Sequence, residues 1–319
     1  MIRVGIVGYG NLGKSLEALI DLEENMELVR IFTRRDPNSI KNERMESLKN
    51  ILDYKDRIDV MVLALGSATD IPEMGPEIAK NFNTVDSFDT HAKIPEYFSE
   101  MDRISKENNL VSFIATGWDP GLFSLNRMVA ESILPRGNTN TFWGKGVSQG
   151  HSDAVRRIAG VKNAVQYTLP KQEIIEDIYN IESDLKSYEA HSREVFIVAE
   201  EGVDKEAIRR EIVTMKNYFD EYETTVHFIS QEEFEREHMV MPHGGHVIRV
   251  GETPNGKEVY KFTLELDSNP DFTASVNLAC IRACQKFFEN NSFGTHTVLD
   301  TPPIYYTDLN SQNAIEKYL

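Results

Sequence analysis

The fold is decided by the stretch IRVGIVGYGNLG, which spans residues 2–13. It combines a β-branched run, Val4–Val7, with glycines at positions 8, 10 and 13, and a helical pattern follows. In a strand–turn–helix of this G-x-G-x-x-G type, Gly8 permits the tight turn, Gly10 lets the backbone approach a pyrophosphate, and Gly13 allows close helix packing. Glycine turns also serve as plain connectors, but the position between a strand and a helix favours dinucleotide binding.

Outward from this motif, short apolar runs alternate with helical stretches as far as about Gly117. Apolar runs separated by helices indicate a parallel sheet that is covered on both faces. We therefore predict an α/β protein that begins with a Rossmann-type doubly wound parallel sheet. The predicted strands are Val4–Val7, Leu28–Phe32, Val60–Leu65, Thr84–Asp86 and Val111–Ala115, and the predicted helices are Asn11–Glu23, Ile71–Asn81 and Ile94–Asn108.

After about Trp118 the pattern changes to longer strands in which apolar and polar residues alternate. Such alternation is typical of strands with one buried face, as in antiparallel sheets, so we predict a C-terminal α+β domain. The predicted strands are Val195–Ala199, Thr224–Phe228, Val247–Val250 and Val259–Leu266, and a long helix covers Phe272–Phe288. The expected domains are 1–118, 119–297 and a tail, 298–319, that packs back on the first.

Composition limits the class of protein. The 319 residues suffice for two domains, and 40% hydrophobic with 27% charged residues is ordinary for a globular chain. The net charge of −17 repels nucleic acid and anionic membranes, so neither is an expected partner. We find no leader and no run of roughly 18 apolar residues, so we expect a cytoplasmic protein. Cys280 and Cys284 should be reduced packing residues.

The residues after the second predicted strand indicate which dinucleotide is bound. An NAD-preferring fold places an acidic residue there, against the ribose 2′-hydroxyl. This chain has Thr33, Arg34 and Arg35 instead. Two guanidiniums and a hydroxyl can bind a 2′-phosphate through charge-assisted hydrogen bonds. We therefore predict NADP as the cofactor of domain 1–118, although the arginines could also be a solvated loop pair.

Further cofactor contacts are expected where the other strands end, because ligands of open α/β sheets bind at the carboxyl edge. The tetrapeptide Ser67-Ala68-Thr69-Asp70 follows the third strand and could also cap the next helix. The expected cofactor contacts are Gly8, Tyr9, Gly10, Asn11, Leu12, Gly13, Thr33, Arg34, Arg35, Ser67, Ala68, Thr69, Asp70, Ser87, Phe88, Asp89, Trp118, Asp119, Pro120 and Gly121.

Two carboxylates stand at that same edge. Asp89 and Asp119 follow the fourth and fifth strands, so we expect both to approach the nicotinamide end of the cofactor. Converging carboxylates suit a cationic amino substrate and make both residues catalytic candidates. Asp119 precedes Pro120, however, so it could equally be a helix N-cap with proline at the first helical position.

Two other chemistries are not indicated. The histidines at 238, 243 and 246 lack the spacing of a zinc site, and Gly244-Gly245 makes a turn rather than a helical ligand face, so no metal is expected. His151-Ser152-Asp153 contains the residue types of a hydrolase triad, but sequence neighbours do not form one and no nucleophile elbow is present.

The motifs resemble those of the meso-diaminopimelate D-dehydrogenases over nearly the whole chain. The resemblance runs through GYGNLG at 8–13, GSATDIP at 66–72, TGWDPG at 116–121, SQGHSD at 148–153, MPHGGH at 241–246 and NPDFTA at 269–274. The segment Lys171–Ala190 is the least characteristic, and Arg193 is placed only by a short match, H-x-R-x-x-F at 191–196.

The resemblance implies a homodimer, with domain 119–297 serving substrate binding and dimerisation. It implies that meso-2,6-diaminopimelate, NADP and water give L-2-amino-6-oxopimelate, ammonia and NADPH. That product cyclises to tetrahydrodipicolinate, and the reverse reaction feeds lysine and cell-wall precursors. The residues implied to line the substrate site are Asp89, Asp119, Trp143, Gln149, Gly150, Thr168, Arg193, His243 and Asn269.

The implied chemistry agrees with these residue types. Asp89 and Asp119 would hold the ammonium of the reacting D-centre, and the distal L-centre would be fixed by Arg193, Thr168, His243 and Asn269. The amine must be neutral before hydride can leave, so one aspartate should accept its proton, and we choose Asp119 as this base. Two rival functions remain: a broader D-amino-acid dehydrogenase, and an NADPH-sensing protein without turnover.

Overall fold

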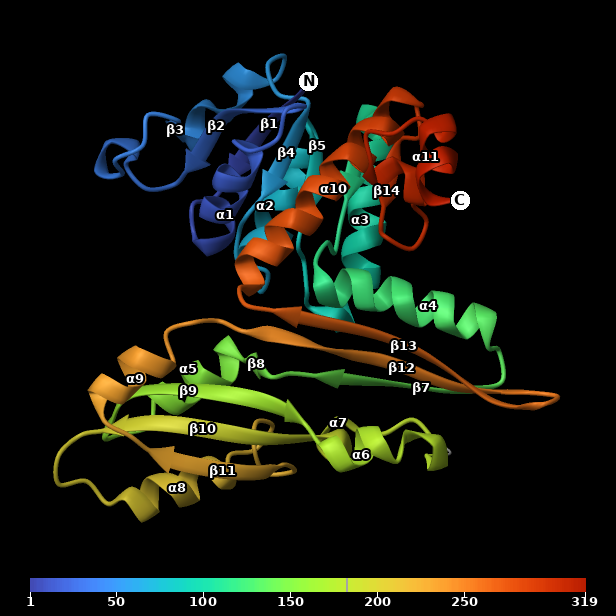
Figure 1. The fold of residues 1–319 in the computed structure, drawn as a ribbon. Helices are drawn as coiled ribbons and strands as arrows, with labels where there is room; N and C mark the ends of the chain where they lie inside the picture. The colour runs from blue at the N-terminus through green and yellow to red at the C-terminus, as the bar shows by residue number, and fades with distance from the viewer. Residues whose placement is uncertain (182) are drawn as a thin grey trace. The chain divides into compact units, whose positions relative to one another are not determined.

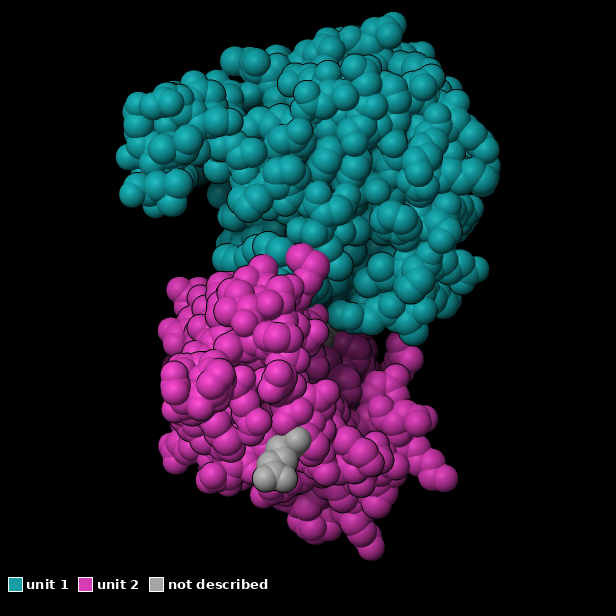
Figure 2. All heavy atoms as spheres, turned by 90° about the vertical axis from the view of Figure 1, so that its right-hand side faces the viewer, with its two compact units in different colours: residues 1–125, 270–319 teal, residues 126–269 magenta. Residues whose placement is uncertain are grey.

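The computed structural model describes residues 1–181 and 183–319, except for the side chain of Gln149. The chain divides into two compact units, which are coloured separately in Figure 2. Unit 1 contains residues 1–125 and 270–319, and unit 2 contains residues 126–269. Among the described residues, no helix is both long enough and apolar enough to cross a membrane.

Unit 1 is built on a parallel sheet with the strand order β14-β6-β5-β4-β1-β2-β3 (Figure 1). Apart from β14, this is the 3-2-1-4-5-6 order of dinucleotide-binding folds. The strands are β1 (Ile2–Val7), β2 (Met26–Thr33), β3 (Met45–Ser47), β4 (Val60–Leu63), β5 (Asn83–Asp86), β6 (Val111–Phe113) and β14 (Gly294–His296). Its helices are α1 (Asn11–Ile20), α2 (Asp70–Ala79), α3 (Ile94–Asn108), α10 (Asn269–Glu289) and α11 (Ser311–Tyr318), and α4 (Phe123–Ile133) continues into unit 2.

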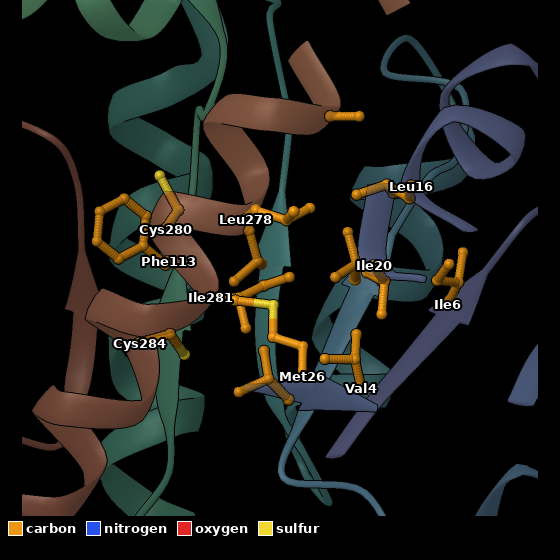
Figure 3. Close-up of a cluster of buried hydrophobic side chains, with 14 of the residues drawn as sticks. Val4, Ile6, Leu16, Ile20, Met26, Phe113, Leu278, Cys280, Ile281 and Cys284 are labelled. Atoms are coloured by element: carbon orange, nitrogen blue, oxygen red, sulfur yellow. The ribbon is translucent and has the colours of Figure 1, made fainter. Parts of the chain in front are cut away.

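Both faces of this sheet are covered, which confirms the doubly wound prediction. On one face α1 and α10 pack on β1 and β6, where Leu16 and Ile20 approach Leu278 and Ile281 (Figure 3). On the other face α2 and α3 bury a separate cluster that includes Tyr97. The four side chains from α1 and α10 are all at most 4% exposed, so this contact is a core rather than a surface.

The two cysteines belong to that core. Cys280 and Cys284 are free and fully buried on α10, which confirms the prediction of reduced packing residues. Burial raises the pKa of both thiols, so they stay protonated and unreactive.

Unit 2 contains two sheets, with the orders β11-β10-β9-β8 and β13-β12-β7. Most strand pairs are antiparallel, as predicted, but β10 and β11 run parallel. The strands are β7 (Gly137–Trp143), β8 (Gly146–Val147), β9 (Val161–Pro170), β10 (His191–Ala199), β11 (Glu223–Phe228), β12 (His243–Thr253) and β13 (Gly256–Leu266). The helices are α5 (Gln149–Arg156), α6 (Gln172–Glu176), α7 (Ser187–Ala190), α8 (Lys205–Val213) and α9 (Gln231–Glu237).

The two units differ from the division expected at residues 118 and 297. Helix α10, expected in the second domain, packs on the parallel sheet of unit 1. Helical periodicity shows that a helix has a buried face, but it does not show which sheet that face covers. In the tail, Val298, Tyr305 and Tyr306 also pack in the core of unit 1.

Candidate functional site

The glycine loop has the local geometry that a bound pyrophosphate requires. Gly8 has φ +102°, and a Cβ there would lie 2.3 Å from the Ala64 carbonyl oxygen. A Cβ on Gly13 would lie 2.4 Å from the Gly8 carbonyl oxygen. A Cβ on Gly10 would meet none of the described atoms within 4 Å, so the backbone is open to a ligand at this point. Helix α1 begins at the next residue, and its first N–H groups can bind an anion.

A pocket of about 360 Å³ lies beside this loop in unit 1. It is lined by Val7, Gly8, Tyr9, Gly10, Phe32, Thr33, Arg34, Arg35, Leu48, Leu65 and Met74. The glycine loop, two arginines and several apolar side chains therefore share one pocket, and these residue types fit a phosphorylated adenosine. Sequence reasoning did not name the five apolar residues of this lining as cofactor contacts, because apolar side chains carry no chemical signal; they are Val7, Phe32, Leu48, Leu65 and Met74.

The two pocket arginines have different surroundings. Arg34 Nη1 lies 2.9 Å from the carboxylate of Asp70, although 59% of the arginine side chain stays exposed. Arg35 donates through Nη2 to the carbonyl oxygen of Tyr9 at 3.3 Å, and its N–H donates to Thr33 Oγ1 at 3.1 Å. Asp70 therefore orients an arginine here, and the structure shows it in that role rather than as a cap. Thr69 occupies the N-cap position of α2, but its side chain makes no capping bond among the described residues.

The loop after β5 is held by a buried carboxylate. Asp86 accepts hydrogen bonds from the Phe88 N–H at 3.0 Å and from the Tyr97 hydroxyl at 2.8 Å. Burial raises the pKa of Asp86 to about 6, and the hydrogen bonds oppose this rise. Asp89 is exposed, and its N–H donates to Ser67 Oγ at 2.8 Å. The loops after β4 and β5 are therefore joined directly beside Asp89.

The interpretation of Asp119 as a helix cap is wrong. Asp119 has φ −154° and ψ 108°, Pro120 has ψ 156°, and α4 begins only at Phe123. The backbone around Pro120 is extended, so these residues cannot start a helix. Trp118 is buried beside Phe123, with ring centroids 5.2 Å apart, while Asp119 keeps partial exposure. The role of Asp119 as a carboxylate of the site stays a prediction.

In unit 2 several predicted substrate residues form a row across neighbouring strands. Arg193 on β10 pairs with Thr168 on β9, and Thr168 pairs in turn with Gly146 on β8. Directly paired residues direct their side chains to the same face of a sheet. A Cβ on Gly146 would lie 2.4 Å from His243 Nδ1, so the imidazole occupies the space over this glycine. Strands β8, β9 and β10 lie side by side (Figure 1), and their pairing gathers residues that are far apart in the sequence.

Arg193 is the most unusual member of this row. Its side chain is only 6% exposed, and its guanidinium carbon lies 3.7 Å from the centroid of the Tyr222 ring. Among the described residues, Nε and Nη1 have no hydrogen-bond partner. Burial lowers the pKa of Arg193, but a guanidinium stays charged in proteins. Two buried donors on a cation are costly without a partner, so the site is suited to a carboxylate ligand.

His243 supplies a hydrogen-bond acceptor rather than a positive charge. Its Nε2 lies 3.0 Å from the carbonyl oxygen of Val147, which can only accept, so Nε2 carries the proton. Burial lowers the pKa of His243, and the ring is therefore neutral with Nδ1 as an acceptor. Thr168 Oγ1 accepts from Gln166 Nε2 at 3.3 Å, which leaves its O–H available as a donor. Sequence reasoning missed Gln166. It lies two residues before Thr168, and this spacing brings the two side chains together only once the segment is known to be a strand.

The remaining predicted residues between 126 and 269 lie on other elements. Trp143 ends β7 and stacks on His191, with centroids 5.3 Å apart. The Asn269 N–H donates to the Met241 carbonyl oxygen at 3.2 Å. Gly150 is exposed near the start of α5, while the side chain of Gln149 lies outside the described part of the chain. The structure therefore groups Arg193, Thr168 and His243 in unit 2, whereas Trp143 ends a strand and Gly150 and Asn269 stand in the first turns of α5 and α10.

The residues of the rejected hydrolase interpretation have other partners. His151 Nδ1 lies 2.5 Å from Ser148 Oγ, whereas Asp153 pairs with Arg156. Burial, together with the charge of Arg193, lowers the pKa of His151 to about 4, so it is neutral near pH 7. Among the described residues, no group of three or more potential metal ligands gathers.

Comparison with known proteins places the chain in a family. Residues 117–268 match the model of the diaminopimelic acid dehydrogenase C-terminal domain. The meso-diaminopimelate D-dehydrogenase of Ureibacillus thermosphaericus is 54% identical over 306 residues, which are 94% of each chain. The meso-DAPDH of Clostridium tetani E88, solved with DAP as a variant with six substitutions, has a TM-score of 0.94 at 48% identity over 100% of both chains.

A second solved structure adds a cofactor complex. An engineered D-amino acid dehydrogenase bound to NADP+ has a TM-score of 0.85 at 41% identity, covering 100% of this chain and 99% of that chain. Both structures share the fold of this chain, and their sequences are 48% and 41% identical to it. This chain therefore belongs to the meso-diaminopimelate D-dehydrogenase family, a family of oxidoreductases that act on CH–NH2 donors.

Proposed function

We propose that the protein catalyses the NADP-dependent, reversible oxidative deamination of the D-centre of meso-2,6-diaminopimelate. The products are L-2-amino-6-oxopimelate, which cyclises to tetrahydrodipicolinate, ammonia and NADPH. In the reverse direction the reaction would feed lysine biosynthesis. The family membership supports the activity, and the residues of the two units support the finer assignment.

The observation that carries this proposal is the buried guanidinium of Arg193. Nε and Nη1 lack partners among the described residues, and the row places a hydroxyl donor and an imidazole acceptor beside them. An L-amino-acid centre has a carboxylate and an ammonium, which match these donors and this acceptor. Asn269 is assigned to the same distal end. A substrate without a charged distal centre would leave the guanidinium unpaired, which favours diaminopimelate over simple D-amino acids.

The reacting D-centre is assigned to the aspartates of unit 1. Asp89 and Asp119 would bind its ammonium, and Asp119 would accept a proton from the nitrogen before the C–H bond breaks. When bound, NADP supplies the acceptor for the hydride that leaves the D-carbon. Water then adds to the imine carbon of the substrate, and ammonia leaves. Trp143, Gln149 and Gly150 are proposed to complete the lining of the substrate site.

The pocket of unit 1 supports NADP as the cofactor. The glycine loop would hold the pyrophosphate, and Arg34, Arg35 and Thr33 would hold the 2′-phosphate. The strand ends are assigned to the nicotinamide side, with contacts from Ser67–Asp70, Ser87–Asp89 and Trp118–Gly121. The engineered relative that binds NADP+ agrees with this choice.

The residue types substituted in the Clostridium tetani variant recur in this chain. Its substitutions replace, in chain order, a glutamine, a threonine, an arginine, a proline, a histidine and an asparagine. The same types occur in the same order and with nearly the same spacing in this chain, at Gln149, Thr168, Arg193, Pro242, His243 and Asn269. The correspondence adds Pro242 to the candidate substrate residues.

The direct test mixes the protein, NADP and meso-2,6-diaminopimelate. NADPH absorbance and released ammonia should rise together in a one-to-one ratio. The control replaces the substrate with D-alanine, which has a D-centre but no distal charged centre, and its kcat/KM should be far lower. Comparable turnover of D-alanine would favour the broader D-amino-acid dehydrogenase, and absence of turnover with binding of NADPH would favour a sensing protein.

We also propose a homodimer formed through unit 2. Strand β13 is an edge strand, and its side chains alternate between exposed and half-buried along most of its length. A second copy could cover this surface, and two-fold dimers are the commonest solution. Light scattering should give about twice the chain mass. A monomer that persists at micromolar concentration would contradict this assembly.

A further inference from the structure

Three polar side chains form a closed hydrogen-bonded ring in unit 1. Asn277 Nδ2 donates to Ser87 Oγ at 3.0 Å, and Thr116 Oγ1 donates to Asn277 Oδ1 at 3.1 Å. The hydroxyls of Ser87 and Thr116 lie 3.2 Å apart, so Ser87 can donate to Thr116 and complete the ring. Asn277 is fully buried, Thr116 is 2% exposed and Ser87 is half-buried. Hydrogen bonds in such a closed, largely buried arrangement strengthen one another.

The ring joins two loops that each lead into one of the candidate aspartates. Ser87 lies two residues before Asp89, in the loop after β5, and Thr116 lies three residues before Asp119, after β6. The Thr116 N–H donates to the Asp86 carbonyl oxygen at 2.9 Å, and the Thr116 hydroxyl oxygen lies 2.9 Å from the same carbonyl, so its single proton is shared between this oxygen and Asn277 Oδ1. Asn277 comes from α10 and is anchored to its own helix, because Nδ2 also donates to the Thr273 carbonyl oxygen at 2.7 Å.

We propose that Thr116 and Asn277 are positioning residues, which set the loops that carry Asp89 and Asp119 in one fixed arrangement. The inference rests on the proposed roles of these two aspartates. Without the ring, the two loops lose their hydroxyl and amide links and keep the contacts of Asp86 with the N–H groups of Thr116 and Ala115, so each aspartate can shift against the other. A shift of about 1 Å in a reacting group can cost on the order of 100-fold in rate. Loss of the ring should therefore lower kcat. The affinity for NADPH should change less, because the glycine loop follows β1 and is not part of the ring.

The pair Thr84–Ser112 provides a matched control, because it lies within the two strands rather than in the loops that follow them. Thr84 Oγ1 donates to Ser112 Oγ at 2.9 Å, and these residues pair across the same two strands, β5 and β6. Thr84→Val and Thr116→Val each remove one buried hydroxyl and keep the side-chain shape. Both should lower the melting temperature to a similar degree. Only Thr116→Val should lower kcat, by roughly 10- to 100-fold with KM for NADP changed less than about 2-fold, and Thr116→Ser should restore kcat.

A double-mutant cycle separates positioning from general damage. If Thr116 acts through Asp119, Thr116→Val should cost less than about 2-fold in kcat when Asp119→Asn is already present. An equal loss in both backgrounds, or equal kcat in the Thr116→Val and Thr84→Val variants, would overturn the inference. If Thr116→Val does not fold, Asn277→Ala takes its place in the same cycle.

A spectroscopic measurement does not depend on activity. The chain has two tryptophans, and Trp118 follows Thr116 closely, so 5-fluorotryptophan labelling gives two ¹⁹F resonances that Trp118→Phe assigns. Thr116→Val should shift or broaden the Trp118 resonance and leave Trp143 unchanged, whereas Thr84→Val should move neither. An unchanged Trp118 resonance overturns the inference even where the parent turns over diaminopimelate. If the parent lacks turnover but the resonance moves, only the proposed function fails.

Discussion

The two units build their candidate sites in opposite ways. In unit 1 the groups come from loops that follow parallel strands, and much of the binding surface is backbone, as at Gly10. In unit 2 the groups come from side chains within and beside paired strands, as at Arg193 and Thr168. In unit 1, N–H groups and charged side chains therefore lie at the carboxyl edge of a parallel sheet. In unit 2, strand pairing holds the side chains over the face of a sheet.

The charges are also handled differently. Arg34 in unit 1 is largely exposed and already has Asp70 as its partner. Arg193 in unit 2 is buried, with two nitrogens that lack partners among the described residues. An exposed, paired charge contributes little to binding, whereas a buried cation that gains a carboxylate contributes much more. Substitutions in the two units should therefore differ in size and in their effect on stability.

The largest effect is expected for Asp119→Asn. The amide cannot accept the proton from the substrate nitrogen, so kcat should fall by about 10²- to 10⁴-fold, the usual contribution of a general base. The KM for NADP should change much less than kcat, because most of the proposed cofactor contacts, including the whole glycine loop, are unaffected. Steady-state kinetics together with NADPH fluorescence titration measure both. An undiminished kcat would remove Asp119 from the role of base.

The next effect is expected for Arg193→Met. Loss of two charge-assisted hydrogen bonds should lower kcat/KM for meso-2,6-diaminopimelate on the order of 100-fold or more. The melting temperature of the free protein should stay equal or rise, because a buried charge without a full set of partners is removed.

Arg249 is the matched control for this prediction. It is 5% exposed, but it donates to the Leu134 carbonyl oxygen at 2.5 Å and to Thr139 Oγ1 at 2.7 Å. Arg249→Met should therefore lower the melting temperature and change kcat/KM much less. If Arg193→Met destabilised the protein as Arg249→Met does, Arg193 would be a structural residue and the contrast between the two units would fail.

The smallest effect is expected in unit 1, for Arg34→Ala combined with Arg35→Ala. Both side chains are close to solvent, so KM for NADP should rise only on the order of 10-fold. Weak use of NAD should change little, because NAD lacks the 2′-phosphate. The surface variant Arg103→Ala, on α3, is the control. Equal losses with both dinucleotides would show that the pair does not contact the 2′-phosphate.

The same contrast explains what could be predicted from the sequence. Helix α3 begins and ends as predicted, since proline stands at its first turn and Asn109, with φ +53°, ends it. The glycine loop and Arg34-Arg35 were found because a local motif encodes them, and they do line one pocket. Strand β14 was missed because it has three residues and exists only through pairing with β6.

The row in unit 2 could not be derived from spacing. Gly146, Thr168, Arg193 and His243 become neighbours only through strand register, which no local pattern specifies. The family resemblance named three of these residues without showing why they belong together. Gln166 was missed for the same reason. It donates to Thr168 on the same strand, and the sequence does not show which face of that strand lines the site.

In the proposed mechanism, different groups distinguish the two ends of the substrate: the aspartates bind the D-centre, and the Arg193 row binds the L-centre. The most direct test measures kcat/KM of the parent protein for the meso, L,L and D,D isomers of 2,6-diaminopimelate with NADP. We expect rapid oxidation of the meso isomer, weak oxidation of the D,D isomer and none of the L,L isomer. Rapid oxidation of the L,L isomer would contradict the proposed mechanism.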